Sequence, residues 1–319
     1  MISVVIPACN EASNIAVTIR SFVDGRRSGV PVEIIVADDA STDGTGTHLP
    51  PAVGTVPVRV LRSRRRLGVA RSRNRAAAAA RGDLLFITDG HVEVDAGWDR
   101  VVLDHAADDR ILAAAIVDRS TGTNCFGCRL VVPYMGTYWN MDAPKGPSPV
   151  QIASSAGTVL PRRLFEDLGG YDEGIRVYGA AEPEFSLRAW LSGANISCIP
   201  DLRINHHFKP KSKRDRFLSD HRTNLIHNNL RFGLCYLSQS KSLEMIRHYA
   251  MKFPRHFPRA LALLVESDVW QRRAKLAASL RYDFDWFVAQ FDLHDQVGRP
   301  ILPTRRRFKS RPAELQCAS

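Results

Sequence analysis

The sequence predicts an α/β protein with a mostly parallel central sheet covered on both faces, followed by a helical region. Short runs that are apolar throughout alternate with amphipathic or Ala-rich segments, and this alternation is typical of parallel strands buried between helices. Beyond about residue 215 the strand-like runs stop and only helical periodicity remains. In sheets of this kind, ligands bind at the carboxyl ends of the strands.

The first half of the chain supplies the alternating elements. Strands are predicted at 2–6, 32–37, 56–61 and 84–88. Ser13 can cap the first helix, whose apolar residues share one face. These residues are Ile15, Ile19, Phe22 and Val23. An Ala-rich helix follows at 68–81 and ends before Gly82.

The second half is less regular. Residues 124–149 are rich in Gly, Pro and aromatic residues, which predicts a long loop or an irregular hairpin over the site. Short helices are predicted at 163–168 and 183–192. We expect a domain of residues 1–212 and a helical C-terminal region of residues 213–319. Its basic, Pro-containing segment 305–312 is predicted to be disordered.

Composition limits the classes of function. The chain has 319 residues, of which 45% are hydrophobic, and a formal charge of +11, which favours anionic partners such as nucleotides or phospholipid headgroups. It carries no nucleic-acid-binding motif, so nucleic acid is not expected as a partner. The lack of a long apolar run and of a signal sequence predicts a cytoplasmic protein. The six cysteines, with Cys125 and Cys128 in a CxxC, are interpreted as ordinary thiols.

A candidate metal-binding pair follows the fourth predicted strand. Asp89 and His91 are two residues apart, with Gly90 between them, and leave the strand on the same side. A carboxylate and an imidazole suit a divalent metal, which could bind a diphosphate. Pro7 and Asp39 lie at the ends of two other predicted strands, so the same edge of the sheet is expected to form a site.

Several segments, in the same order, resemble family 2 glycosyltransferases of the GT-A fold, a Rossmann-like nucleotide-diphospho-sugar transferase fold. They are VVIPACNE, VADDASTDGT, LGVARSRNRAAAAARGDLLFITDG and GGYDEGIRVYGAAEPEFSLRAWLSG. The resemblance covers roughly residues 2 to 210. It implies a metal-dependent enzyme that moves a sugar from a nucleotide-diphosphate donor, with a UDP-sugar expected, to a hydroxyl of an acceptor.

A finer resemblance concerns the metal ligands. FITDGHVEVDAGW and PDLRINHHFK are similar to segments of the polypeptide N-acetylgalactosaminyltransferases, which carry Asp-x-His where most family 2 enzymes carry Asp-x-Asp. The resemblance implies that His206, rather than His207, is the third ligand beside Asp89 and His91. One carboxylate and two imidazoles suit Mn²⁺ and tolerate Mg²⁺.

The resemblance also implies which residues meet the nucleotide. Asp39 is expected to accept a hydrogen bond from an imide N–H of the base, whereas Asp38 and Asp43 are interpreted as turn formers. Arg71 and Arg73 diverge by about 200° on a helix, so we expect Arg73 to orient Asp89 and Arg71 to make a weaker contact. The full expected set is Pro7, Ala8, Asn10, Glu11, Asp39, Arg66, Arg71, Arg73, Asp89 and Gly90.

Glu182 bears on the stereochemistry of transfer. Counting back from Arg188 along the family's acidic motif places Glu182 at the Asp that serves as general base in inverting members. The retaining aminosugar transferases have Asn there. A carboxylate can take the acceptor's proton, so an inverting transfer is predicted. Two departures are noted: Ala181 replaces the usual Glu, and Pro183 follows the base.

Other residues have two interpretations each. Trp98 and Trp139 can stack on sugar rings or pack in the core. Gly157 matches a small-residue turn that lets the sugar approach the backbone, and Glu184 can touch the sugar or acceptor or simply belong to the start of its helix. The basic residues after His206 form either a lid over the diphosphate or an ordinary linker. They are Lys209, Lys211, Lys213 and Arg214.

The acceptor has no readable motif, and a natural product or cell-surface precursor of a bacterium is expected. The alternatives are a retaining enzyme similar to the polypeptide N-acetylgalactosaminyltransferases, a metal hydrolase and a non-catalytic nucleotide-sugar binder. A further alternative is a polyprenyl-phosphate glycosyltransferase in peripheral contact with a membrane. Phe253, Phe257 and Trp270, which lie among basic residues, would permit that contact.

Overall fold

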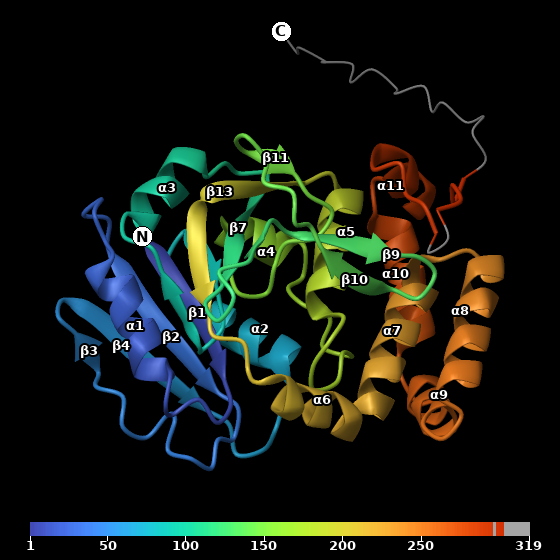
Figure 1. Cartoon of the computed structure of the whole chain (residues 1–319), viewed down its shortest axis with the longest axis horizontal. Coiled ribbons are helices and arrows are strands. Elements are labelled where there is room, and N and C mark those ends of the chain that lie inside the picture. Colours follow the sequence, from blue (N-terminus) through green and yellow to red (C-terminus); the bar gives the residue numbers. More distant parts are fainter. Residues whose placement is uncertain (296–297, 303–319) are drawn as a thin grey trace, which may run out of the picture.

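The computed structural model describes residues 1–295 and 298–302 of the chain. The predicted disordered segment 305–312 and Cys317 lie outside these residues. The described part is a mixed α/β structure with one large sheet, and helices α7 to α11 gather at the end farthest from β3 (Figure 1).

The four predicted strands are confirmed and form the parallel half of the sheet. They are β1 (Ile2–Ala8), β2 (Val32–Asp38), β4 (Val56–Arg62) and β5 (Leu84–Ile87). β1 lies between β2 and β5, and β4 pairs with β2. Nearly all apolar residues of β1, β2 and β5 are buried, on both faces, as expected of parallel strands. In β4, Val56 and Val58 are buried, whereas Pro57 is exposed. Asp38 and Asp39 therefore leave β2 at the same edge at which Asp89 leaves β5.

The other half of the sheet is mixed. Here β12 (Thr158–Pro161) is antiparallel between β5 and β7 (Arg110–Asp118), and β13 (Asn195–His206) runs parallel to β7. The full order is β11-β13-β7-β12-β5-β1-β2-β4-β3. Short strands complete it at β3 (Ala52–Val53), β6 (Val92–Val94), β8 (Asn124–Cys125) and β11 (Ser148–Pro149). A separate antiparallel pair, β9 (Cys128–Val131) and β10 (Gly136–Trp139), is the irregular hairpin predicted within 124–149.

Helices cover both faces of the sheet. On one face α1 (Ile15–Asp24) and α3 (Trp98–His105) bury their apolar residues, and on the other lie α2 (Val69–Ala79), α4 (Arg162–Asp167) and α5 (Ala181–Ser192). The expected cap of α1 is wrong by one residue: Asn14 is the N-cap, and it makes no side-chain capping bond.

The C-terminal region is helical, as predicted. Its helices are α6 (Lys211–Asp220), α7 (Arg222–Tyr236), α8 (Gln239–Lys252), α9 (Phe257–Val265), α10 (Val269–Ser279) and α11 (Phe284–Gln290). Leu230, Leu276 and Phe287 from these helices share one hydrophobic core with Phe185 of α5. No helix within the described residues is both long enough and apolar enough to cross a bilayer.

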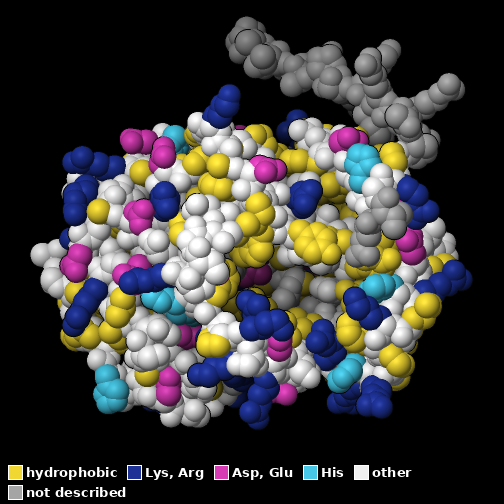
Figure 2. Space-filling view, in the orientation of Figure 1, with side chains coloured by type: hydrophobic (Ala, Val, Ile, Leu, Met, Phe, Trp, Pro, Cys, Tyr) yellow, Lys and Arg dark blue, Asp and Glu magenta, His cyan; other side chains and the backbone are white. Residues whose placement is uncertain are grey.

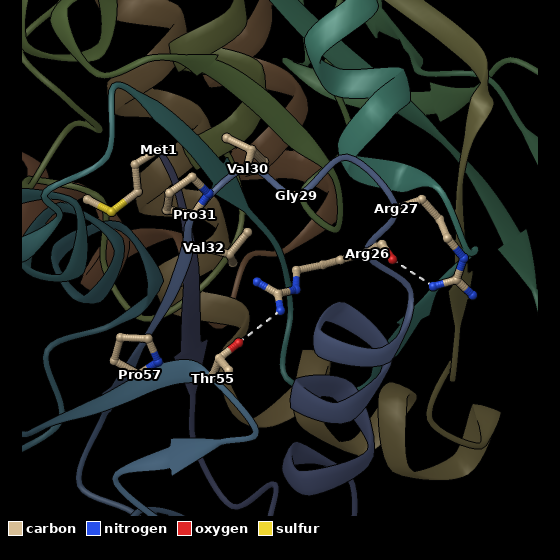
Figure 3. A pocket seen from close by; sticks show the side chains of 9 residues that line it. All are labelled: Met1, Arg26, Arg27, Gly29, Val30, Pro31, Val32, Thr55 and Pro57. Carbon is tan, nitrogen blue, oxygen red and sulfur yellow. Dashed lines mark hydrogen bonds between the residues drawn. The ribbon is translucent and has the colours of Figure 1, made fainter.

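A hollow of about 710 Å³ lies at the amino ends of β1, β2 and β4, lined in part by Met1, Pro31 and Pro57 (Figure 3). Arg26 Nη2 donates to Thr55 Oγ1 there at 3.2 Å. Because the strands run parallel, this hollow is at the opposite end of the sheet from Asp89 and lies outside the site described next.

Candidate active site

The three predicted metal ligands meet at the carboxyl end of the sheet. Asp89 and His91 follow β5, and His206 is the last residue of β13. The β13–β6 ladder sets His206 opposite Val92, the neighbour of His91. One ligand atom from each of the three residues lies within 4.8 Å of the others. The prediction that these side chains form one cluster is confirmed.

His207 faces away from this cluster. Successive side chains near a strand end point to opposite sides, so only one of the two adjacent histidines can face Asp89. His206 Nε2 is 3.6 Å from Asp89 Oδ2, whereas His207 Nε2 lies 2.9 Å from Glu93 Oε1. The structure thus places His206, and not His207, beside Asp89, and its role as a metal ligand stays a prediction.

The cluster fits a divalent metal ion. Its one carboxylate and two imidazoles suit Mn²⁺ and tolerate Mg²⁺. His206 Nε2 faces Asp89 Oδ2 at 3.6 Å, and the rings of His206 and His91 are 4.8 Å apart between centroids, so the three side chains surround one small space. Burial opposes the charge on Asp89, but His206, Arg73 and His91 outweigh it and hold the pKa of that carboxyl well below its usual range. Asp89 is therefore in the form that coordinates metals.

Arg73 connects this cluster with Glu182. It projects from α2 and is buried, with Nη2 3.2 Å from Asp89 Oδ1 and Nη1 in an ion pair with Glu182 Oε1. Burial lowers the pKa of Arg73, but Glu182 and Asp89 more than reverse this and raise it. Arg71 diverges as expected: it is exposed, and its Nε donates to the carbonyl oxygen of Glu173 at 3.0 Å.

Glu182 is the second residue of α5 and faces the same site through Arg73. Among the described residues only Arg73 hydrogen-bonds to it, so Oε2 is left without a protein donor. The side chain is partly exposed. The arrangement supplies a carboxylate oxygen that can accept a proton from a bound hydroxyl group.

Asp39 builds the turn that enters α2. Its Oδ1 accepts the N–H of Leu67 at 2.6 Å, its Oδ2 accepts the N–H of Gly68 at 3.0 Å, and Arg66 Nε is 3.5 Å from Oδ2. A carboxylate has about four lone-pair positions, so these contacts leave capacity for the N–H of a base. Asp38 accepts the N–H of Ser41 at 3.0 Å, which confirms its interpretation as a turn former.

The loop after β1 lies beside this turn. Asn10 has a left-handed backbone (φ 58°), and its Oδ1 accepts the N–H of Thr42 at 2.9 Å. Asp43 accepts the N–H of Ala12 at 2.9 Å and is also a turn former, as expected. Pro7 and Ala8 end β1 on the same side. These contacts join the ends of β1 and β2 into one wall.

Glu11 was expected to line the nucleotide pocket, but its carboxylate contacts His91 of the metal cluster and Lys209. Its Oε1 lies 3.2 Å from His91 Nδ1 and 2.8 Å from Lys209 Nζ. Burial raises the pKa of Glu11, but the contacts with His91 and Lys209 outweigh this and lower it to about 2. A Cβ at Gly90 would lie 3.3 Å from Glu11 Cγ, so the small residue between the two ligands leaves room for Glu11. Lys209 thereby ties the segment after β13 to the metal side of the site.

Residues 3–169 match the model of glycosyl transferase family 2. The chain belongs to this family. Among curated relatives it is 31% identical over 229 residues to polypeptide N-acetylgalactosaminyltransferase 13 of Rattus norvegicus, covering 65% of this chain and 41% of that protein. It is 29% identical over 242 residues to the inactive polypeptide N-acetylgalactosaminyltransferase-like protein 5 of Macaca fascicularis, covering 69% and 54%. The chain thus spans about half the length of the curated relatives it matches.

Solved structures support the fold of this family 2 chain. The structure of GalNAc-T7 with UDP, GalNAc and Mn²⁺ superposes with a TM-score of 0.71 at 19% identity, covering 91% of this chain and 56% of that one. S. aureus TarS 1-349 in complex with UDP gives a TM-score of 0.52 at 17% identity, covering 81% and 72%. The GT-A fold prediction is confirmed.

Two residues expected near the sugar contact core residues. Trp98 is only 2% exposed, and its Nε1 donates to the carbonyl oxygen of Phe22 at 3.1 Å, so it cannot stack on a sugar. A Cβ at Gly157 would lie 2.5 Å from Ala114 Cβ, so glycine is required there by packing within the sheet. For Trp98 the sugar-contact prediction is wrong because core residues surround its ring, whereas for Gly157 the approach of a sugar to the backbone stays a prediction.

Glu184 does not face the site either. It is 1% exposed, and its two oxygens accept hydrogen bonds from Arg188 and Arg272 at 2.6–3.0 Å and from the Tyr236 hydroxyl at 2.8 Å. Burial raises the pKa of Glu184, but the two arginines dominate and hold it well below its usual range. The proposed sugar or acceptor contact is therefore wrong, and Glu184 joins α5 to the C-terminal helices.

Trp139 remains available to an acceptor. It is partly exposed on β10 and lines a hollow of about 290 Å³ with Phe126 and Arg129.

The described cysteines show no sign of a special role. On β9, burial chiefly raises the pKa of Cys128 to about 12, with Cys125 and Glu182 adding to the effect. The five cysteines in the described part are free thiols, in agreement with the interpretation of the CxxC.

Two contributors were not singled out from the sequence. Ser155 Oγ donates to Asp89 Oδ2 at 3.3 Å, and its only signal was its place in the same small-residue segment as Gly157. Asn228 of α7 hydrogen-bonds to the loop that leads into α5. The helical periodicity of the C-terminal region gives no signal that distinguishes Asn228 from its neighbours.

Proposed function

We propose that this chain is a metal-dependent glycosyltransferase that uses a nucleotide-diphosphate sugar, with UDP as the expected nucleotide. One observation carries the proposal. The Arg73 guanidinium pairs with Asp89, the expected metal ligand, and with Glu182, whose other oxygen has no donor among the described residues. Relatives named as N-acetylgalactosaminyltransferases and a similar fold solved with UDP support it. A metal hydrolase would leave the turn around Asp39 and the Arg73–Glu182 pair without a role.

In the proposed reaction, the acceptor's hydroxyl oxygen attacks C1 of the sugar. The bond from C1 to the diphosphate oxygen breaks, and the nucleoside diphosphate leaves with that electron pair. The acceptor's proton passes to Glu182 Oε2. A metal bound by Asp89, His91 and His206 would neutralise the charge on the departing diphosphate.

Inversion at C1 is the finer proposal. Attack from the face opposite the diphosphate, assisted by Glu182, gives the opposite anomeric configuration. The partly exposed carboxylate with an unoccupied Oε2 supports it. In a retaining transfer by direct attack, the acceptor approaches from the face that the diphosphate leaves, so no general base is needed on the opposite face.

The test needs no knowledge of the acceptor, because water can replace it. The protein is given α-linked UDP-sugars and Mn²⁺, and the released sugar is followed by proton NMR before its anomers equilibrate. Inversion predicts that the β-anomer appears first, and α-anomer appearing first would refute it. A binding panel of UDP-, GDP- and TDP-sugars with Mn²⁺ fixes the donor, and absence of any binding would contradict the whole proposal.

The acceptor is proposed to be a natural product or a cell-surface precursor, and the C-terminal helices favour one presented at an anionic membrane. Between Met245 and Val265 the chain has no acidic residue and four basic ones: Arg247, Lys252, Arg255 and Arg259. Met251, Val265 and Trp270 are 81%, 73% and 58% exposed. Figure 2 shows hydrophobic and basic side chains interspersed along the edge over α8 and α9. Apolar residues among basic ones are typical of helices that bind anionic lipid surfaces.

The aromatic residues expected to reach that membrane behave differently from one another. Phe253 is partly buried and lies under the Arg222 guanidinium at 5.0 Å, and Phe257 also packs on the core. Of these three aromatic residues only Trp270, at the start of α10, is exposed. The proposed contact surface therefore consists of Met251 on α8, Val265 at the end of α9 and Trp270.

Sedimentation with vesicles tests this surface. Binding to vesicles containing phosphatidylglycerol, but not to pure phosphatidylcholine, is expected, and Val265→Glu and Met251→Glu should each weaken it. Val17→Glu on α1, also at an exposed apolar position, is the matched control and should bind normally. Equal weakening by Val17→Glu, or no binding by the unchanged protein, would contradict the membrane contact.

A further inference from the structure

The segment that leads into α5 has an unusual backbone. It runs from Asp172 to Ala180, two residues before Glu182. Val177 and Ala180 have φ values of 55° and 65°, a left-handed conformation that is rare for residues other than Gly, Asn and Asp and especially unfavourable for a β-branched one. Such a conformation persists only where the surroundings hold it, so the position of Glu182 depends on what holds this segment.

One buried side chain from the C-terminal region holds it. Asn228 of α7 is fully buried. Its Nδ2 donates to the carbonyl oxygens of Arg176 at 2.8 Å, Tyr178 at 2.9 Å and Gly179 at 3.3 Å. Its Oδ1 accepts the N–H of Arg176 at 2.9 Å. A primary amide combines two donors with an acceptor, which a carboxylate of the same shape does not.

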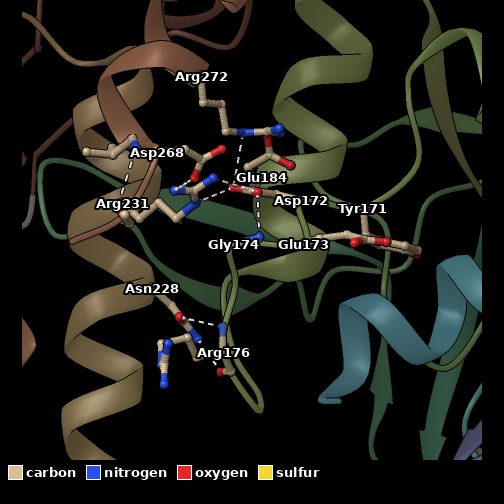
Figure 4. Close-up of polar contacts among 12 residues, drawn as sticks. Tyr171, Asp172, Glu173, Gly174, Arg176, Glu184, Asn228, Arg231, Asp268 and Arg272 are labelled. Atoms are coloured by element: carbon tan, nitrogen blue, oxygen red, sulfur yellow. Dashed lines mark hydrogen bonds and ion pairs between the residues drawn. The ribbon is translucent and has the colours of Figure 1, made fainter. Parts of the chain in front are cut away.

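Arg231, one turn further along α7, holds the beginning of the same segment. Its Nε and Nη2 donate to the two oxygens of Asp172 at 2.7 and 2.9 Å. A Cβ at Gly174 would lie 2.2 Å from the Arg231 guanidinium carbon, so the backbone lies directly against this side chain. Figure 4 shows Asn228 and Arg231 projecting from α7 toward the segment that carries Asp172 and Arg176.

The far side of the segment rests on the start of α2. The N–H of Val69 donates to the carbonyl oxygen of Val177 at 2.9 Å, and a Cβ at Gly68 would lie 2.8 Å from Val177 N. The segment is thus clamped between α7 and α2, the helix that carries Arg73. Both partners of the Arg73–Glu182 ion pair are placed by elements that contact this segment.

We infer that Asn228 is a positioning residue for transfer: it holds residues 176–179 in their left-handed turn and so places Glu182 against Arg73 and the acceptor. The inference rests on the proposed function, because it gives Glu182 the role of base. It assigns to the C-terminal helices a part in the reaction that is independent of any membrane contact. Asp89, His91 and His206 lie on other elements, and the segment reaches the turn around Asp39 through Gly68 and Val69, so metal and nucleotide binding should depend on Asn228 much less than transfer does.

The experiment compares Asn228→Ala and Asn228→Asp with Asn229→Ala. Asn229 is the next residue of α7 and donates to the Tyr249 hydroxyl at 2.7 Å, away from the segment. Both Asn228 variants should lower kcat by about 10- to 100-fold, because small displacements of a reacting group have effects of this size. Their affinity for the UDP–Mn²⁺ complex and KM for the donor should stay within about twofold of the unchanged protein. Asn229→Ala should retain kcat.

A second variant separates positioning from simple loss of stability. Glycine adopts the φ of Val177 without strain, so adding Val177→Gly to Asn228→Ala should restore part of kcat. An unchanged kcat in a folded Asn228→Ala protein, or a fall in nucleotide affinity parallel to the fall in kcat, would overturn the inference.

Hydrogen exchange gives a readout that does not require activity. The amides of residues 176–180 should exchange faster in Asn228→Ala than in Asn229→Ala, and equal rates would overturn the clamp. If the unchanged protein neither transfers nor hydrolyses any nucleotide sugar, the proposed function fails while this comparison still decides whether Asn228 holds the segment.

Discussion

Arg73 Nη2 lies 3.2 Å from Asp89 Oδ1 in the buried floor of the site. The same guanidinium forms an ion pair with Glu182, so a single side chain fixes a metal-ligand carboxylate relative to the proposed base. Arg presents several N–H groups in a rigid plane, and this geometry can serve two carboxylates at once. The spatial relation between metal and base therefore depends on one residue of α2.

Replacing Arg73 by Lys should lower kcat by about 100-fold, because an ammonium cannot hold both carboxylates in a fixed geometry. The measurement is steady-state donor hydrolysis or transfer, with circular dichroism to verify folding. Arg75→Lys is the control, since Arg75 is exposed two residues along the same helix and donates to Ser63 Oγ. Equal effects of the two substitutions would contradict the role given to Arg73.

His206→Ala should weaken Mn²⁺ binding by more than about 100-fold. Removing a residue that only hydrogen-bonds to a metal ligand typically weakens binding by about 10- to 100-fold, and loss of a ligand itself should exceed this. Calorimetric titration of Mn²⁺ in the presence of UDP measures this. The adjacent His207→Ala should bind Mn²⁺ normally, because its ring pairs with Glu93. Loss of the metal in His207→Ala, with retention in His206→Ala, would reverse the assignment.

Glu182→Gln should reduce transfer by about 100- to 10,000-fold, since removal of a general base typically has effects of this range. The amide keeps the shape but cannot take the acceptor's proton. Affinity for UDP and Mn²⁺ should change little, because Glu182 belongs to α5 and the metal ligands do not. Turnover close to that of the unchanged protein would remove Glu182 as the base.

The sequence predicted the parallel strands and the pair Asp89 and His91 well because both depend on local pattern. Apolar runs identify strands, and parallel strands bring their carboxyl ends, with Asp39 and Asp89, to one edge. His206 could not have been found from periodicity, as it lies 115 positions (206 − 91) after His91. Its selection over His207 depended on the resemblance to a family.

The failures concern residues whose partners are distant in sequence. Glu184 looks like a site residue beside Glu182, but its partner Arg272 lies 88 positions away. Trp98 meets core residues that no local pattern connects to it. Asn228 was missed for the same reason, because its hydrogen bonds are to backbone atoms of a loop 49–52 positions earlier.

Glu184→Gln should destabilise the fold by about 3–5 kcal/mol at neutral pH, as is typical when one partner of a buried ion pair is removed. The folded-state pKa of Glu184 lies below the unfolded value of about 4.3. Its contribution is therefore fully present above the unfolded value and decreases progressively as the pH falls from that value toward and through the folded-state pKa. Urea unfolding at pH 7 and pH 3.5 should show the difference between the two proteins shrinking in acid. A difference independent of pH would show that its charge is not what stabilises the fold.

Gly157→Ala should distinguish a packing role from a role in sugar binding. The new Cβ would lie 2.5 Å from Ala114 Cβ and 3.1 Å from Ile204 Cγ1, and overpacking of this kind destabilises by about 1–3 kcal/mol. Adding Ala114→Gly removes the nearest atom and should recover part of the lost stability, as measured by urea unfolding. Donor KM in the folded single variant should be unchanged, because the side chain meets core atoms and not the site. A raised donor KM with normal stability would instead support the close approach of the sugar expected from the sequence.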